Sequence, residues 1–491
     1  MRKPEGSQRR SDPAGRSGPP PREWSGEQDG AAGPTGTGSP GDGVPAPASV
    51  PARGHDAGHG RTSGSDRTPV QAADRPAGIS RRRLLAGSGL ASAAFLATAG
   101  TVVIGTAPAA GAANIGGDSA DQSSPIPFHG AHQAGITTVE QSRLVFAAYD
   151  VTSPDRDGLV ALLEQWSAAA GRLTAGEQVA TAQGRFTPPV DTGEALDLPP
   201  SRLTVTVGFG PGLFDPRFGL HGRRPKALVD LPAFPGDALD PSRSGGDLCI
   251  QACADDAQVA FHAVHNLTRL ALGSATLRYL QVGFGRTASA GAGQPTPRNL
   301  LGFRDGTDNL TGADQAAMDR FVWVGRETEQ PWMIGGSYLV ARRIRTHLEA
   351  WDRSPLDDQQ RTIGRVKISG APLGSTAERD HLDLRALGPD GQLLIPENAH
   401  VRVASPESNG GQAILRRGYS FVDGTDPDSG ELDAGLFFVC FQKDPRRQFI
   451  PVQQRLSRHD ALSEYVLHTG SAIFACPPGI APGQSWAHAL A

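Results

Sequence analysis

The hydrophobic pattern becomes regular only downstream of Ser124, and from there it predicts two halves of similar build. In the first half, runs of apolar and β-branched side chains at 142–149, 203–208 and 248–253 predict strands. Apolar positions at helical spacing within 157–172 and 256–272 predict two helices between or after these strands.

The second half repeats this order of strands and helices. The predicted strands lie at 336–344, 400–403 and 435–441, and the predicted helices at 346–353 and 455–462. Strand-helix-strand order with antiparallel returns predicts an α+β fold made of two ferredoxin-like domains, each a four-stranded antiparallel sheet with peripheral helices. The expected division is an N-terminal domain at 125–300, a connecting segment at 301–330 and a C-terminal domain at 331–485.

The first 78 residues have a different composition from the rest. Gly, Pro, Ser, Arg and Asp predominate and large apolar side chains are almost missing, so these residues cannot bury enough surface to offset the entropy of ordering. We therefore expect disorder over 1–78. The alternative is that this leader is untranslated, because a start codon other than ATG at Val70 would leave a short basic leader.

Residues 79–113 have the three parts of an export signal. A basic start with Arg81, Arg82 and Arg83 precedes a moderately apolar stretch, and small residues follow it. Paired arginines ahead of such a stretch resemble a twin-arginine signal, with cleavage expected between Ala109 and Asn114. The alternative is a membrane anchor over 84–104, which at roughly 20 residues is long enough to span a bilayer but is weakly apolar.

Charge and cysteine content narrow the classes of function. The net charge of −4 gives no general attraction to nucleic acid, which we do not expect as a partner. Four cysteines in 491 residues are too few for a disulfide scaffold, and their spacing does not make a zinc site. We expect them to be small buried side chains.

A loop between the two halves contains the string Gly302-Phe303-Arg304-Asp305-Gly306-Thr307. On its residues alone, Asp-Gly predicts only a turn. The longer string resembles the signature of dye-decolorising haem peroxidases, and further segments that resemble this family follow one another in the family's order. They lie at 128–136, 363–374, 398–402, 414–420, 441–449 and 468–471. The resemblance spans about residues 126–480 and is strongest to an exported branch that includes the peroxidase of Efe-type iron uptake.

The resemblance implies one haem b per chain, bound mainly by the C-terminal domain. His400 matches the proximal histidine, the axial ligand to the haem iron. Asp460 is the candidate that accepts a hydrogen bond from the second ring nitrogen of this histidine, which would fix its tautomer.

Two catalytic residues are implied on the opposite, distal face of the haem. Asp305 matches the family's acid-base residue, which moves a proton between the two oxygens of the peroxide. Arg416 matches the distal arginine, whose fixed charge stabilises the departing hydroxide and which also contacts the haem. Because Asp is a weaker base than the distal histidine of other peroxidases, we expect activity to favour acidic pH.

Further haem contacts are implied by position in the family pattern. They are Gly306, Thr307, Asp308, Arg365 (or Lys367 in its place), Ser405, Pro406 and Glu407. The chain departs from the family at two of these places: Ser-Pro-Glu replaces a frequent Asn-Pro-Arg, and Asp308 replaces a small residue. Glu407 beside a haem propionate would be repulsive, because both groups carry negative charge.

The predicted function is a haem peroxidase that reduces hydrogen peroxide and oxidises phenolic, dye-like or other small aromatic reductants in one-electron steps. The alternatives are a deferrochelatase that releases iron from haem, and a haem carrier without turnover. We further expect a homo-oligomer, export to the periplasm, cell envelope or exterior, and a permease of an iron-uptake system as a partner.

Overall fold

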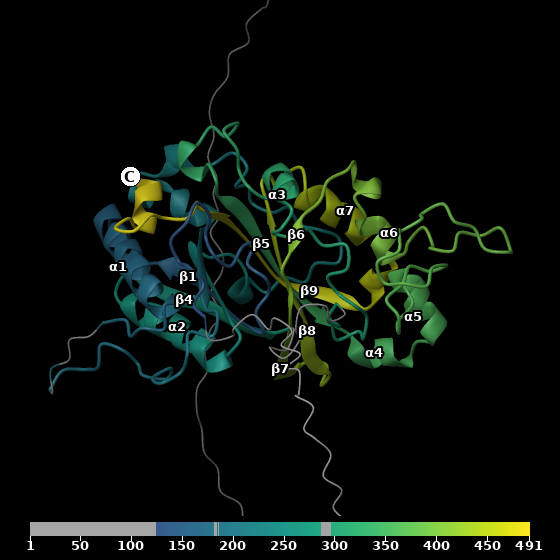
Figure 1. The fold of residues 1–491 in the computed structure, drawn as a ribbon, viewed down its shortest axis with the longest axis horizontal. Coiled ribbons are helices and arrows are strands. Elements are labelled where there is room, and N and C mark those ends of the chain that lie inside the picture. The colour runs from purple at the N-terminus through teal and green to yellow at the C-terminus, as the bar shows by residue number, and fades with distance from the viewer. Residues whose placement is uncertain (1–123, 181–183, 185, 286–295) are drawn as a thin grey trace, which may run out of the picture. The chain divides into compact units, whose positions relative to one another are not determined.

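The computed structural model describes residues 124–180, 184, 186–285 and 296–491, all of which belong to one unit, Ala107–Ala491 (Figure 1). The predicted leader at 1–78 and the predicted export signal at 79–113 lie outside the described residues. Across the described ranges, every helix is too short or too polar to cross a membrane.

The first half of the fold is a four-stranded antiparallel sheet with two helices. Its strands pair in the order β2-β3-β1-β4. Both helices begin at an aspartate whose carboxylate accepts backbone N–H groups of the first turn, Asp155 for α1 and Asp256 for α2. The elements are β1 (Arg143–Val151), α1 (Arg156–Thr174), β2 (Thr204–Phe209), β3 (Leu248–Ala254), α2 (Ala257–Leu270) and β4 (Ala275–Phe284).

The second half repeats the arrangement with more helices at its margin. Its strands pair in the order β9-β5-β8-β7, and the short β6 also pairs with β8. The elements are α3 (Gln315–Phe321), β5 (Ser337–Thr346), α4 (Leu348–Arg353), α5 (Leu356–Ile363), α6 (His400–Ala404), β6 (Leu415–Arg416), β7 (Tyr419–Thr425), β8 (Leu432–Gln442), α7 (Phe449–His459) and β9 (Val466–Cys476). Short 3₁₀ helices lie at η1 (Pro211–Phe214), η2 (Pro216–Phe218), η3 (His221–Arg223), η4 (Pro241–Arg243), η5 (Pro331–Met333), η6 (Glu407–Asn409), η7 (Ala461–Glu464) and η8 (Trp486–Leu490).

The two half-sheets are joined edge to edge. One bridge pairs Phe209 of β2 with Ala475 of β9, and another pairs Phe284 of β4 with Ser420 of β7. A glycine lies at each junction: a Cβ on Gly208 would stand 2.7 Å from the Cβ of Phe474, and a Cβ on Gly283 would stand 2.7 Å from that of Tyr419. The prediction of two separate sheets is therefore corrected to one linked sheet, because glycine lets the edge strands approach.

The core is shared between the halves. Phe146 of β1 packs against Phe437 of β8 and Phe474 of β9, with ring centroids 5.1 and 6.1 Å apart. On the opposite face of the first half, Tyr149 meets Trp166 of α1. All four cysteines are buried and free, as the sequence predicted. The predicted α+β class is confirmed.

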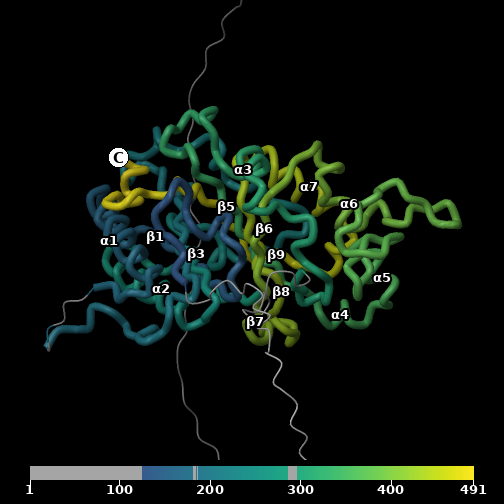
Figure 2. Tube along the Cα trace, in the orientation of Figure 1, coloured from purple at the N-terminus to yellow at the C-terminus, as the bar shows by residue number. Residues whose placement is uncertain are grey.

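The C-terminal end of the chain returns to the first half. Helix η8 contacts α1, and the C-terminus lies beside α1 (Figure 2). There the backbone N–H of Trp486 donates to the hydroxyl of Ser167, and its indole packs on Phe128. The predicted sequence elements did not include this return.

One predicted strand is wrong, and it contains the proposed iron ligand. Residues 400–403 form the start of helix α6, although Val401 and Val403 favour a strand locally. The helix packs against α7, and that tertiary contact outweighs the local preference of the valines.

Candidate active site

The loop that contains Asp305 is held by its own backbone and by one asparagine. The backbone N–H of Asp305 donates to the carbonyl of Pro297 at 2.8 Å. The side-chain oxygen of Asn299 accepts the N–H groups of Leu301 and Phe303, and its amide nitrogen lies 3.4 Å from Oδ2 of Asp305. Asp305 is thus presented by a turn of defined geometry.

Arg416 reaches this loop from strand β6. Its Nη1 donates to Oδ1 of Asp305 at 3.2 Å, and its Nη2 donates to the carbonyl of Thr307 at 3.1 Å. The two side chains keep 32% and 31% of their surface accessible, so the pair is reachable by a small molecule. An acid-base group and a fixed positive charge therefore stand side by side.

His400 is the first residue of α6, and a carboxylate fixes its orientation. Its Nδ1 lies 2.6 Å from Oδ2 of Asp460, whose Oδ1 accepts the backbone N–H of Leu462 at 2.9 Å. Since the carboxylate can only accept, Nδ1 carries the proton, and Nε2 of the neutral ring keeps its lone pair. Nε2 makes no hydrogen bond within the described residues, so the lone pair is available to a ligand.

Both burial and the neighbouring Asp460 act on the pKa of His400. Burial alone would lower the pKa of His400, but the neighbouring Asp460 outweighs it and the net pKa is raised. The same side chain keeps 35% of its surface accessible. The imidazole is therefore held by a carboxylate and remains partly accessible to a ligand.

The charges of Asp305 and Arg416 both act on the imidazole of His400. The charge of Asp305 raises the pKa of His400 and the charge of Arg416 lowers it, although neither is hydrogen-bonded to the imidazole in the described structure. An available imidazole nitrogen with an acid-base group and a cation near it is the donor set that a haem peroxidase requires. The residues present therefore fit haem.

The three residues after Asp305 were predicted to contact haem. The structure shows the backbone conformation of the first and the protein partners of the other two. Gly306 has φ +113°, a conformation that favours glycine. The hydroxyl of Thr307 donates to Glu378 at 3.0 Å. Asp308, at φ +59°, forms an ion pair with Arg365 at 2.5 Å.

Arg365 is nearly buried and has several protein partners. Besides Asp308, it donates to the carbonyls of Gly370 and Glu378 at 2.8 and 3.0 Å. The alternative residue, Lys367, donates to Gln359 at 2.6 Å and lies over the ring of Phe303. The contact of either side chain with a haem propionate stays a prediction.

The segment Ser405-Pro406-Glu407 follows α6 directly. Ser405 is buried, and its hydroxyl donates to the carbonyl of Arg402 and accepts the N–H of Ser408, which ends the helix. Glu407 is exposed and forms an ion pair with Arg385, with Oε1 of Glu407 3.7 Å from Nη2 of Arg385. Arg385 therefore offsets part of the negative charge that Glu407 brings to this segment.

Sequence reasoning missed three supporting side chains. Asn299 and Asn309 lie just outside the string Gly302–Thr307, on either side of Asp305, and the sequence does not show which atoms they contact. Glu378 comes from a distant loop, where it accepts from Thr296 and Thr307 and lies 3.2 Å from Arg304. No pattern in the sequence marks Glu378.

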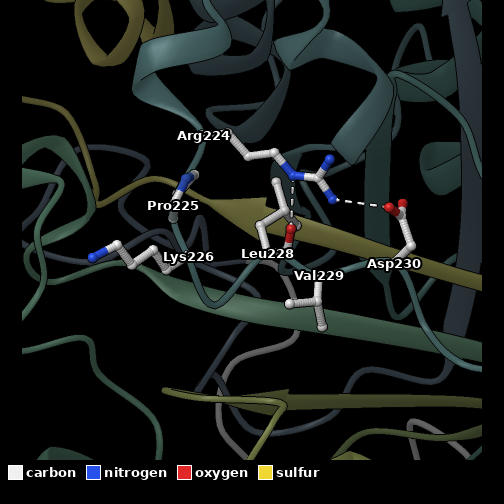
Figure 3. Close-up of a pocket in the computed structure, with 6 residues that line it drawn as sticks. All are labelled: Arg224, Pro225, Lys226, Leu228, Val229 and Asp230. Atoms are coloured by element: carbon white, nitrogen blue, oxygen red, sulfur yellow. Dashed lines mark hydrogen bonds and ion pairs between the residues drawn. The ribbon is translucent and has the colours of Figure 1, made fainter. Parts of the chain in front are cut away.

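A separate surface hollow of about 280 Å³ lies over residues 224–230 (Figure 3). Arg224 donates there to the carbonyl of Leu228 at 2.9 Å and to Asp230 at 3.2 Å. The hollow contains none of the predicted site residues, and the charge of its arginine is already paired.

Comparison with known proteins shows which family the chain resembles. The family models described as Dyp-type peroxidase, N-terminal, and Dyp-type peroxidase, C-terminal, match residues 133–285 and 296–481. A protein named Deferrochelatase from Yersinia pestis bv. Antiqua (strain Nepal516) is 38% identical over 428 residues, which is 85% of this chain and 96% of that protein. A protein of the same name from Escherichia coli (strain UTI89 / UPEC) is 38% identical over 82% of this chain and 94% of its own length.

Solved structures give the same result. The X-ray generated oxyferrous complex of DtpA from Streptomyces lividans is 44% identical, with a TM-score of 0.71 over 76% of this chain and 99% of that chain. A DyP-type peroxidase from Streptomyces coelicolor is 45% identical, with a TM-score of 0.69 over 74% and 95%. With both family models matched in order and relatives aligned over nearly their whole length, the chain belongs to the Dyp-type peroxidase family.

Proposed function

We propose that Asp305, Arg416 and His400 form the catalytic centre of a haem-dependent peroxidase. As a Dyp-type peroxidase, the protein is an oxidoreductase that acts on hydrogen peroxide. The observation that supports the assignment of residues is the Asp305–Arg416 pair at 3.2 Å, which lies near enough to His400 for both charges to act on the pKa of its imidazole.

On the proximal side, His400 would hold the haem iron through Nε2. When bound, haem supplies the redox-active iron at which peroxide is reduced. Asp460 keeps the imidazole in the Nδ1-protonated tautomer and increases its electron donation through the hydrogen bond at 2.6 Å.

On the distal side, Asp305 would take the proton from one oxygen of hydrogen peroxide and deliver it to the other oxygen, which leaves as water. Arg416 offers two donors of fixed charge beside this path, so it stabilises the negative charge that develops on the leaving oxygen. Neither residue is consumed, and electrons from the reductant complete the cycle.

The finer features are part of the same proposal. The group is haem b, one per chain, and the reductants are phenolic, dye-like or other small aromatic molecules oxidised one electron at a time. Each half is proposed to be a ferredoxin-like unit, which the strand orders β2-β3-β1-β4 and β9-β5-β8-β7 support. The C-terminal half would supply most haem contacts, since His400, Arg416 and Asp460 all belong to it.

A second candidate function is release of iron from haem, since relatives that are 38% identical over most of the chain are named Deferrochelatase. In that case haem is the substrate, and a permease of an iron-uptake system is the expected partner. A haem carrier without turnover is less favoured, because a carrier needs no acid-base pair opposite its iron ligand. Export by the twin-arginine route to the periplasm, envelope or exterior, and a homo-oligomeric state, complete the proposal.

The test is spectroscopic and kinetic. The purified protein, reconstituted with haem, is expected to show a Soret band and to oxidise a phenolic reductant when hydrogen peroxide is added. Asp305→Asn and Arg416→Ala should each retain the Soret band and slow the peroxide step by roughly 100-fold or more. Lack of haem binding, or unchanged peroxide turnover in both variants, would contradict the proposal.

The two candidate activities differ in their product. Deferrochelatase activity yields free iron and an intact, metal-free porphyrin, whose fluorescence reports it directly. Peroxidase activity yields oxidised reductant while the haem absorbance persists. Formation of the fluorescent porphyrin with no reductant oxidation would favour the second function.

A further inference from the structure

The side-chain amide of Asn309 forms hydrogen bonds with both the backbone N–H and the backbone carbonyl of Arg416. Nδ2 of Asn309 donates to the carbonyl of Arg416 at 2.7 Å, and Oδ1 accepts the N–H of Arg416 at 3.0 Å. Asn309 itself is tied to the catalytic loop by a turn, since its N–H donates to the carbonyl of Gly306 at 3.2 Å. The amide therefore links strand β6 to the segment that begins at Asp305.

The position of β6 explains why this link is needed. β6 is two residues long, and among the described residues it pairs with β8 on one side and with no strand on the other. The N–H of the next residue, Arg417, donates to Val439 of β8, so the N–H and carbonyl of Arg416 point to the opposite edge. The side chain of Asn309 occupies that edge as a neighbouring strand would.

Arg416 is thus joined to the loop at four points. Two involve its guanidinium, which donates to Asp305 and to the carbonyl of Thr307. The other two involve the amide of Asn309 and do not depend on any titratable group. When Asp305 takes up a proton during turnover, its ion pair with Arg416 weakens, but the amide contacts persist.

We propose that Asn309 is a positioning residue that holds Arg416 beside Asp305 in both protonation states of Asp305. The inference rests on the proposed catalytic role of this pair. Asn309 acts through Arg416 and does not itself touch the peroxide. A small displacement of the guanidinium is enough to lower the rate, because charge stabilisation depends steeply on placement.

The test is a double-mutant cycle on the haem-loaded protein, read as the rate of its reaction with hydrogen peroxide. Asn309→Ala is expected to lower this rate by roughly 10- to 100-fold. In an Arg416→Ala background the same change should have no further effect, because its action passes through Arg416. Additive losses, or a rate within about twofold of wild type for Asn309→Ala, would overturn the inference.

The proposed function is distinguished within the same cycle. If Arg416→Ala and Asp305→Asn leave the rate unchanged, the catalytic assignment fails. If those variants are slow and Asn309→Ala is not, only the role of Asn309 fails. Asn266→Ala, which removes a buried amide on α2 that donates to Thr192, is the matched control and should keep wild-type activity per folded molecule.

A second variant covers a failure of Asn309→Ala to fold. Asn309→Asp keeps the side-chain volume and the acceptor for the N–H of Arg416. Its second oxygen replaces the donor to the Arg416 carbonyl, so the two oxygens repel each other until the carboxylate is protonated. Its rate relative to wild type should therefore recover as pH falls, and a ratio that does not change with pH would contradict the role of the amide donor. Hydrogen exchange of the haem-free protein gives a readout without activity: the peptide that covers β6 should exchange faster in Asn309→Ala.

Discussion

The carboxylate of Asp460 serves two groups at once. Oδ2 accepts from Nδ1 of His400 at 2.6 Å, while Oδ1 accepts the N–H of Leu462 at the start of η7. Because the second contact fixes the carboxylate, the imidazole cannot rotate without losing its partner. The orientation of the proposed iron ligand is therefore set by the turn that follows α7.

Replacing Asp460 by Asn should weaken the electron donation from His400 to the haem iron. The asparagine amide is neutral, so the substitution removes the negative charge that makes the imidazole a strong electron donor. We expect the haem reduction potential to rise and the peroxide rate to fall by about 10- to 100-fold. Spectroelectrochemistry and stopped-flow measurements check both effects.

Asp155→Asn is the control for Asp460→Asn. It removes a carboxylate that starts α1, where Asn caps a helix equally well. Its potential and rate should equal those of wild type. An unchanged potential in Asp460→Asn would contradict the role given to the proximal carboxylate.

The ion pair between Asp308 and Arg365 leads to a prediction about haem retention. Arg365 is nearly buried, and Asp308 offsets its charge at 2.5 Å. Asp308→Asn keeps a residue that tolerates φ +59° but removes the charge. If Arg365 contacts the haem propionates, as the sequence predicts, the freed guanidinium should slow haem loss by up to about tenfold.

Capture of released haem by apomyoglobin measures this rate. Asp197→Asn, at another left-handed position with φ +65°, is the matched control and should leave haem loss unchanged. Equal or faster haem loss from Asp308→Asn would exclude Arg365 as a propionate partner.

Glu194 should contribute stability that acid removes. Burial would raise its pKa, but hydrogen bonds from His262 and Thr192 outweigh burial and lower the pKa to about 2. A folded pKa below the ordinary value of 4.5 means that the stabilisation is complete above pH 4.5 and is lost as the pH falls toward 2.

Glu194→Gln should therefore cost about 1–2 kcal/mol at neutral pH, a figure reduced for the partial exposure of the side chain. The difference from wild type should vanish near pH 2 in urea unfolding. Glu177→Gln breaks an exposed ion pair with Arg172 and should change stability by less than about 0.5 kcal/mol. A loss in Glu194→Gln that persists unchanged in acid would contradict the assignment.

Local pattern was enough to predict most of the first half. β1 and β3 are buried along nearly their whole length, so continuous apolar runs marked them. β4 was missed because exposed Thr276, Leu277 and Arg278 interrupt its pattern. The family resemblance and the peroxidase function inferred from it are confirmed by the matched family models.

The parts that were not predicted depend on contacts between distant segments. The helical state of His400 follows from packing against α7, which the valines beside it do not show. The joined sheet depends on close approaches at Gly208 and Gly283, where a sequence shows only two glycines within strands. Likewise, the contacts of Asn309 require that a loop and a two-residue strand meet in space.

His468 should also make the protein sensitive to acid, but here the folded protein disfavours the charged form instead of stabilising it. Burial and the nearby charge of Arg342 lower the pKa of His468 from 6.5 to about 3, so the folded state holds the ring neutral. Between these values the unfolded chain binds a proton that the folded protein does not, and the free energy of unfolding falls as the pH falls. In the wild-type protein, Nε of Arg342 donates to Nδ1 of His468 at 3.3 Å. His468→Gln keeps an acceptor for this nitrogen, but the glutamine side chain cannot become protonated. Relative to wild type, the variant should gain about 1 kcal/mol per pH unit below pH 6.5, measured by urea unfolding. A difference between the two proteins that stays constant from neutral pH to pH 4.5 would show that His468 is not held neutral.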